Sequence, residues 1–384
     1  MALSCNLQVL ELSGLRLDQP LTGCGSLNAS EAGLASEARF VAVQRAFQAA
    51  LDRRVDLVVL HSDVLSKSSA GGRAPWFLAK MIESCSQRGI PVVWAEAKHN
   101  VWMERFVASP AWLVRAVPGD AHRVTTKAGA VLVHVGRPTS LRLPAGHDEV
   151  QAVIGLDCGT SSRLDLDGCD LVLQRGGGSS DRIEDFVTAT HAGEPHPLAA
   201  LHTLRVDRAN RCETLDTLPV GFTRVSCSLS SGLSANSLVE HFGDEIDAAA
   251  GRYFAAHPQT QLLLVDLSVT GHGAAWDSLW NRDDRQSLID GLNERTRHPS
   301  CHVRSLEGLA DGVEATRSCP FTPTLNAIWT ESTARPVHAV RSLADLVPDS
   351  MALGDWSRHQ PIPVDHSLAP EVRHACLHLL RSAS

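Results

Sequence analysis

Two short apolar segments, each followed at once by polar residues, constrain the fold of this chain more than any other feature. Residues 55–60 read VDLVVL and are followed by HSDVLS, and residues 90–94 read IPVVW and are followed by AEAKHN. Continuous apolar runs of this length are typical of parallel strands that are buried on both faces. Because sites in parallel sheets collect beyond the carboxyl ends of the strands, the polar residues that follow are the first candidates for chemistry.

The first 100 residues alternate between strand and helix patterns. Residues 7–12 form a short apolar run, residues 36–54 carry apolar side chains at helical spacing, and residues 75–88 predict a second helix. Together with the strands at 55–60 and 90–94, this βαβαβ order predicts a doubly wound α/β layer with right-handed crossovers.

Shorter β-type runs separated by Gly, Pro and Asp dominate residues 110–220, and we expect them to form the second sheet of a β-sandwich. These runs are residues 130–135, 150–156, 169–173 and 201–206. Strand and helix patterns alternate again over residues 221–311, which predicts a second, compact βαβαβ domain. The predicted domains are therefore 1–220 and 221–311, followed by a Pro-rich extension over 312–384 with a short helix near 369–381.

Composition narrows the function classes. Hydrophobic residues make up 43% of the 384 residues and charged residues 20%, as in ordinary soluble globular proteins. The net charge of -8 gives no general attraction to nucleic acid, so DNA binding would need a local basic patch. Ten cysteines without a CxxC pair, and no signal peptide, predict reduced thiols in a cytoplasm. No apolar run approaches the roughly 20 residues of a membrane-spanning helix, so we expect no membrane partner.

The strand-end motifs resemble those of the calcineurin-like metallophosphoesterases, in particular the DNA double-strand-break repair exonucleases whose nuclease subunit works with an SMC-like ATPase. In that family the first strand ends in a DxH motif, and here SGLRLDQP has Gly14 and Arg16 at those two positions. The family's AGDLFD motif corresponds to HSDVLS, which keeps Asp63. The resemblance runs through most of residues 7–310.

The next motifs depart further from the family pattern. GNHD corresponds to AKHN, in which His99 is retained, Lys98 replaces the metal-binding Asn and Asn100 replaces the Asp. Where the family has a His after an apolar strand, the segment VIGLDCGTS offers Cys158 or Asp157. The retained His is, in the family, an acid that assists at the phosphate, and an isolated histidine needs partners to do that work.

The family's GHxH motif corresponds to RGGGSS, where Gly176 and Gly178 stand in place of histidines. The resemblance implies a four-layer α/β/β/α sandwich over residues 1–220, followed by a small capping domain over 221–311 that helps shape a DNA channel. It also implies DNA and an SMC-like ATPase as partners, and a possible homodimer.

The substitutions remove the chemistry that such a motif set needs. Two divalent ions a few ångström apart require about seven oxygen and nitrogen ligands to orient a hydroxide. Gly14 donates none, and a positive charge on Arg16 or Lys98 repels a cation strongly at an effective dielectric of about 20. We therefore expect no bound metal, with Asp63 a vestigial ligand that a Lys or Arg side chain neutralises and His99 a vestigial acid. The nearby His61 is expected to pack or to form a hydrogen bond rather than to bind metal.

Three hypotheses about function follow. The first is a catalytically degenerate exonuclease-like protein that keeps a scaffolding or DNA- and partner-binding role. The second is an active DNA exonuclease or phosphoesterase that depends on manganese or another divalent metal, with a reduced site made of Asp63, His99 and the region of Asp157 and Cys158. The third is a regulatory assembly subunit without DNA contact, which the acidic net charge favours.

Overall fold

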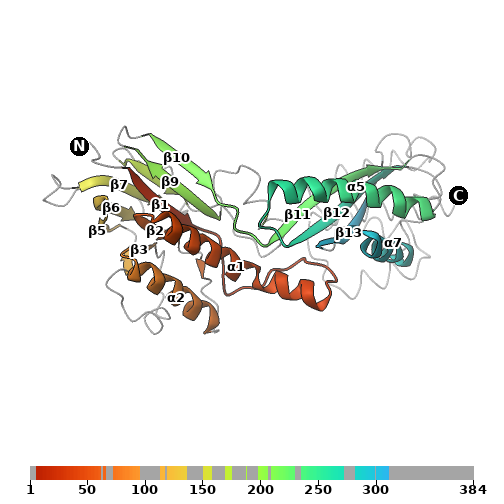
Figure 1. Cartoon of the computed structure of the whole chain (residues 1–384), viewed down its shortest axis with the longest axis horizontal. Coiled ribbons are helices and arrows are strands. Elements are labelled where there is room, and N and C mark those ends of the chain that lie inside the picture. The colour runs from red at the N-terminus through yellow and green to blue at the C-terminus, as the bar shows by residue number, and fades with distance from the viewer. Residues whose placement is uncertain are drawn as a thin grey trace, which may run out of the picture. The chain divides into compact units, whose positions relative to one another are not determined.

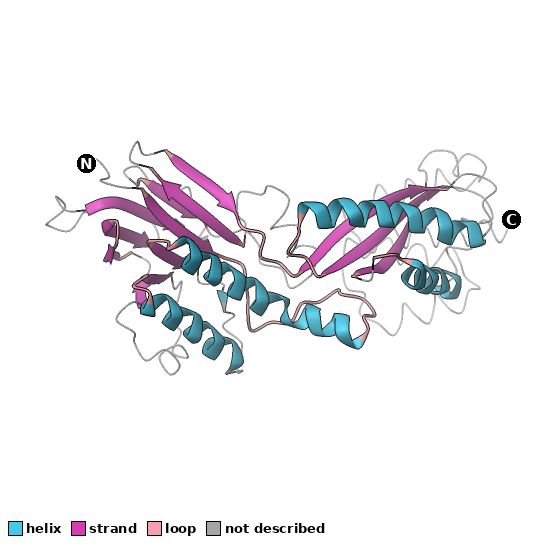
Figure 2. Cartoon of the chain, viewed as in Figure 1, coloured by secondary structure: helices cyan, strands magenta, loops and turns pink. Residues whose placement is uncertain are grey.

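The chain folds as a mixed α/β protein, shown in Figures 1 and 2. The computed structural model describes residues 6–61, 64–65, 72–95, 113–116, 119–135, 150–157, 169–174, 187, 198–205, 209–229, 235–271, 282–298 and 300–310. Its elements are β1 (Leu7–Leu12), α1 (Ala29–Arg53), β2 (Leu57–Leu60), α2 (Arg73–Gln87), β3 (Val92–Ala95), β4 (Leu113–Ala116), β5 (Ala121–Thr126), β6 (Gly129–Val135), β7 (Val150–Asp157), β8 (Leu171–Gln174), β9 (Ala199–Leu204), β10 (Asn210–Thr214), β11 (Val220–Ser228), α5 (Ala235–Ala256), β12 (Leu262–Gly271), α7 (Arg282–Arg295) and β13 (Cys301–Ala310). None of the helices in these ranges is long and apolar enough to cross a membrane.

A six-stranded sheet, in the order β10-β9-β1-β2-β3-β4, forms the centre of the N-terminal part. Strands β1 to β4 are parallel, β9 runs antiparallel to β1, and β10 runs antiparallel to β9. Every residue of β2 and β3 is buried, as their continuous apolar sequences predict. The carboxyl ends of β1, β2 and β3 therefore meet at one edge of the sheet, where the sequence predicted the site.

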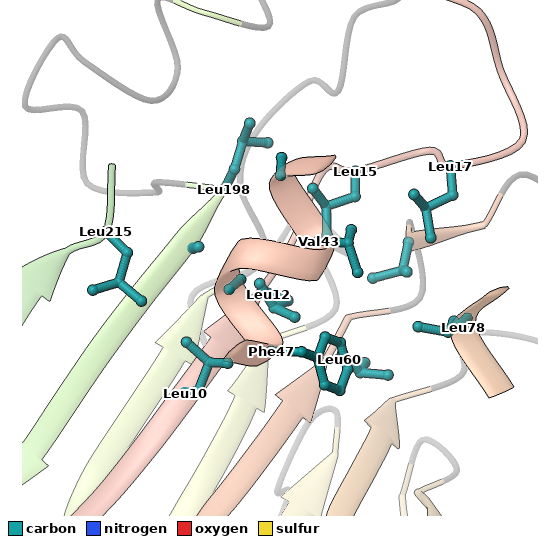
Figure 3. Packing of buried hydrophobic residues seen from close by; sticks show 14 of the residues in the cluster. Leu10, Leu12, Leu15, Leu17, Val43, Phe47, Leu60, Leu78, Leu198 and Leu215 are labelled. Carbon is teal, nitrogen blue, oxygen red and sulfur yellow. The ribbon is translucent and has the colours of Figure 1, made fainter. Parts of the chain in front are cut away.

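Helices α1 and α2 cover one face of this sheet. Apolar side chains of both helices pack on alternate residues of β1, β2 and β3, and Figure 3 shows Phe47 of α1 against Leu60 of β2. Helix α1 begins at Ala29, seven residues before the predicted start, because Asn28 and Glu31 form a capping box. The Glu31 backbone N–H donates to Asn28 Oδ1, and the Asn28 N–H donates to Glu31 Oε2, both at 3.0 Å.

The opposite face of the six-stranded sheet packs on a four-stranded sheet in the order β5-β6-β7-β8. This second sheet was predicted, but the assignment of the run at 201–206 to it is wrong. That run is β9, which lies between β1 and β10 in the first sheet. Five of the six residues of β9 are buried, as expected for a strand with neighbours on both sides. An outer helical layer on the four-stranded sheet is not seen among the described residues and stays a prediction.

A three-stranded sheet, β11-β12-β13, accompanies α5 and α7 in the C-terminal part. Residues Leu262 to Val269 of β12 are all buried, and α5 buries Leu238, Phe242 and Ile246 at a spacing of four residues. These strands and helices follow the predicted βαβαβ order. The terminal extension and its predicted helix lie outside the described residues.

The chain divides into two compact units. The first comprises Met1–Val225, Leu238–Leu267 and Gln286–Leu306, and the second Ser226–Ser237, Ser268–Arg285 and Glu307–Ser384. The side-chain clusters of functional interest lie within the first unit. The domain boundaries at residues 220 and 311 remain a prediction.

Candidate functional site

The candidate site lies at the carboxyl edge of the central parallel strands. Two of its predicted residues, Gly14 and Arg16, follow β1 and are described by the structure. Asp157 is the last residue of β7, and only its backbone is described. The remaining predicted site residues lie outside the described ranges, and these are Asp63, Lys98, His99, Asn100, Cys158, Gly176 and Gly178.

The segment that follows β1, residues 13–17, is named here the β1-end loop, and it is fastened by backbone hydrogen bonds. The N–H of Ser13 donates to the carbonyl of Leu198 at 3.0 Å, and the N–H of Leu17 donates to that of Val64 at 2.9 Å. Leu15 and Leu17 point into the core that α1 covers and are 1% and 2% exposed (Figure 3). The loop is therefore held by the residue before β9, by the segment after β2 and by its own leucines packed in the core.

The two predicted site residues adopt unusual backbone conformations in this loop. Gly14 has a φ of 68° and Arg16 a φ of 37°, both in the left-handed region. A glycine reaches this region without strain, whereas a residue with a β-carbon does so at a cost. The side chain of Arg16 donates from Nη1 to Gln19 Oε1 at 3.3 Å. The loop thus presents one position without a side chain and one cation.

A second cation supports the β1-end loop from below. Arg39 of α1 is only 2% exposed, and its Nη1 donates to the carbonyls of Leu15 at 3.1 Å and Arg16 at 2.8 Å. A buried guanidinium keeps its charge, because its pKa lies far above neutrality. The carbonyl oxygens of the loop are therefore engaged by a permanent positive charge of the protein itself.

These residues do not fit a pair of divalent cations. Gly14 has no ligand atom, and Arg16 and Arg39 place two positive charges in and under the loop where the resemblance expects an Asp and a His. Like charges at such short range repel by several kcal/mol, even at an effective dielectric of about 20. Within the described ranges, no group of three or more His, Cys, Asp or Glu side chains could hold a metal ion. The proposed neutralisation of Asp63 stays a prediction, because that residue is outside these ranges.

Three residues form a buried polar cluster beside the loop, named here the Glu11 cluster. Glu11 of β1 accepts a hydrogen bond on Oε1 from His61 Nε2 at 2.7 Å and on Oε2 from His202 Nε2 at 2.8 Å. His61 follows β2, and His202 belongs to β9. Glu11 is 6% exposed, His61 0% and His202 8%. His61 forms a hydrogen bond, as expected. Glu11 and His202 were not predicted, although a charged residue inside the apolar strand LQVLEL signals a buried partner.

The two histidines keep Glu11 ionised in the core. Burial by itself would raise the pKa of Glu11, but hydrogen bonds from His202 and His61, together with the electrostatic influence of the two rings, lower it below its ordinary value of 4.5. The influence of this carboxylate extends to the edge strand β10, where Cys212 lies opposite His202 in the strand register. Although Cys212 as a whole is exposed, partial desolvation of its sulfur, and then the negative charge of Glu11, raise the pKa of the Cys212 thiol.

We expect the Glu11 cluster to make the fold sensitive to acid. The lowered pKa means that the ionised carboxylate stabilises the fold above pH 4.5, and that this contribution is lost as the pH falls through the folded-state pKa. The loss of unfolding free energy caused by Glu11→Gln should therefore be largest near about pH 7 and shrink below about pH 4. Urea unfolding at a series of pH values measures it. Glu213→Gln, at an exposed pair with Arg53, should change little at any pH.

Comparisons with known proteins leave the family assignment open. No family model matches the chain, and no curated protein matches it by sequence. The resemblance to metallophosphoesterases consequently rests on the motifs alone.

Proposed function

We propose that this protein is a catalytically degenerate relative of the DNA repair exonucleases of the calcineurin-like metallophosphoesterase type, with a scaffolding or DNA- and partner-binding role in the cytoplasm. Its partners in this proposal are DNA and an SMC-like ATPase. Helices α1 and α2, the six-stranded sheet and the four-stranded sheet correspond to three of the four layers of such a sandwich. The sheet β11-β12-β13 and its helices are compatible with a capping domain.

The observation that carries the proposal is the construction of the β1-end loop. A catalytic loop at this position must offer ligands to a cation and leave their lone pairs free. Here Gly14 offers no side chain, Arg16 is a cation, and the carbonyls of residues 15 and 16 accept from the buried Arg39. A loop built in this way supports the fold instead of a metal-bound hydroxide.

Manganese-dependent cleavage tests the loss of catalysis. The full-length protein is incubated with Mn²⁺ and linear duplex DNA, or with a generic phosphodiester, beside the variants Asp63→Ala and Asp120→Ala. The second variant removes an exposed carboxylate in the turn before β5 and serves as the control. We expect all three proteins to show the same background. Cleavage that Asp63→Ala abolishes and Asp120→Ala retains would instead support the enzyme with a reduced metal site.

Salt-dependent DNA binding tests the retained role. Contacts to phosphates release counterions, so the association constant falls steeply with salt concentration when Lys and Arg side chains bind the backbone. We expect binding of duplex DNA at about 50 mM salt that is largely lost at about 200 mM. Absence of binding at the lower concentration, together with retention of an ATPase partner, would favour an assembly subunit that does not contact DNA.

A further inference from the structure

The Glu11 cluster is unexplained by a scaffolding role alone. A carboxylate inside a protein is destabilising unless it is paired and fully hydrogen-bonded. Glu11 stands on β1, at the centre of the six-stranded sheet, and faces the layer shared with the four-stranded sheet, as do its strand neighbours Leu7 and Val9. His202 belongs to β9 and His61 directly follows β2, and these are the two strands on either side of β1. The cluster therefore joins three adjacent strands through side chains, beside the β1-end loop.

The ring nitrogens that face Glu11 are already engaged in hydrogen bonds within the cluster. Each oxygen of Glu11 accepts one ring N–H, so both Nε2 atoms carry protons and neither has a lone pair to offer. The Nδ1 atoms of His61 and His202 are buried and have no hydrogen-bond partner among the described residues. A carboxylate that orients an imidazole in this way is also found behind metal-bound histidines, so the position of the two rings decides between the alternatives.

The strand register places the backbones of the two histidines far apart, on opposite sides of Glu11. His202 pairs with Val9 of β1, whereas the N–H of His61 donates to the carbonyl of Leu12, so His61 lies about level with Ser13. Four residues along a strand span roughly 13 Å, and the outer two of three adjacent strands are roughly 9.5 Å apart. Each ring therefore reaches Glu11 from its own side of β1, with Nε2 at 2.7 Å and 2.8 Å from the two carboxylate oxygens. Among the described residues these side chains do not form a group that could hold a metal ion.

We propose that the Glu11 cluster is a metal-free replacement for the ions of a metallophosphoesterase site, which ties β9, β1 and β2 together at the site edge without any divalent cation. Ions that bridge ligands from several strands contribute their binding free energy to folding. Here two charge-assisted hydrogen bonds between neighbouring strands make the corresponding connection. This inference rests on the proposed function, because the Glu11 cluster would supply the stabilisation that a metallophosphoesterase fold loses with its metal ions.

Thermal unfolding of the full-length protein tests the replacement. In EDTA and in millimolar Mn²⁺ the wild-type melting temperatures should agree within about 1 °C, because no site links the ion to folding. Glu11→Gln should lower the melting temperature in EDTA by about 5 °C or more, and His202→Gln, whose amide can still donate to Glu11, by less. The exposed Glu213→Gln serves as the matched control and should leave it unchanged. A Mn²⁺-dependent rise of several degrees in the wild type, or a Glu11→Gln variant as stable as the wild type, would overturn the proposal.

Nitrogen-15 spectra of the histidine rings in the wild type provide a readout that needs no variant to fold. In EDTA, two ring N–H signals should exchange slowly with solvent, because both Nε2–H groups are buried and donate to Glu11. Their absence would refute the cluster. DNA cleavage is measured separately. A protein that cleaves DNA with Mn²⁺ would contradict the proposed function. If the same protein keeps these signals and its stability in EDTA, the proposed role of the Glu11 cluster still holds.

Discussion

Asp266→Ala is expected to cause one of the two largest losses of stability in this chain, about 3–5 kcal/mol of unfolding free energy. Asp266 of β12 accepts from Arg304 Nε at 2.8 Å on Oδ1 and from Arg304 Nη2 on Oδ2, and its Oδ1 also accepts from Ser305 Oγ at 2.6 Å. The side chains of Asp266 and Arg304 are only 3% and 7% exposed. Removing the carboxylate leaves a guanidinium buried without its charge partner, and that charge is the main source of the loss.

The same pair predicts a different outcome when both charges are removed. Replacing a buried ion pair with apolar residues of similar volume is often close to neutral, because the penalty for burying the two charges disappears with them. The double variant Asp266→Leu with Arg304→Met should therefore recover most of the stability that Asp266→Ala loses. Recovery will be incomplete, since Arg304 Nη1 also donates to the carbonyl of Gly23 at 2.5 Å and its guanidinium lies 5.0 Å from the ring centre of Phe222.

Urea unfolding followed by circular dichroism at 222 nm measures both variants. Asp244→Ala is the matched control, because Asp244 also pairs with an arginine, Arg295, but its side chain is 67% exposed. Exposed ion pairs contribute about 1 kcal/mol or less, so this variant should remain close to the wild type. Equal losses in Asp266→Ala and Asp244→Ala would contradict the prediction, and so would a double variant that is less stable than Asp266→Ala.

The strands and helices with strong local patterns could be predicted from the sequence. β2 and β3 follow from continuous apolar runs, and α2 and α5 from helical spacing of apolar residues. β10 was missed because all five of its residues are exposed and carry no alternation. β9 was placed in the wrong sheet, because a run of apolar residues indicates burial and not which strands lie beside it.

The candidate site could be predicted only in part, for a related reason. The positions of Gly14 and Arg16 follow from the end of β1, since a strand end is a local feature of the sequence. Glu11 and His202 are 191 residues apart, and only the pairing of β1 with β9 brings them together. Arg39 appears in the sequence as one more charge on α1, and nothing near it indicates that its guanidinium points into the core. Local sequence patterns do not predict which residues tertiary structure brings into contact.

Arg39→Met is the second variant for which we expect a large loss, about 2–4 kcal/mol of unfolding free energy. Hydrogen bonds that involve a charged group contribute about 1.5–3 kcal/mol each, and a buried carbonyl left without a donor adds a further penalty. The methionine keeps the helix propensity and much of the buried hydrocarbon, so the loss reports the removal of the guanidinium, including its two bonds to the carbonyls of Leu15 and Arg16. Urea unfolding at neutral pH measures it.

Arg45→Met provides the control on the same helix. Arg45 Nη1 also donates to two carbonyls, those of Thr217 at 3.3 Å and Gln259 at 2.8 Å, but its side chain is only partly buried, so water can replace it there. We expect Arg45→Met to lose about 1 kcal/mol or less. If the two variants lose the same amount, the β1-end loop does not depend on a buried guanidinium. If Arg39→Met alone is strongly destabilised, the β1-end loop is held by the protein's own cation, and its geometry is part of the fold.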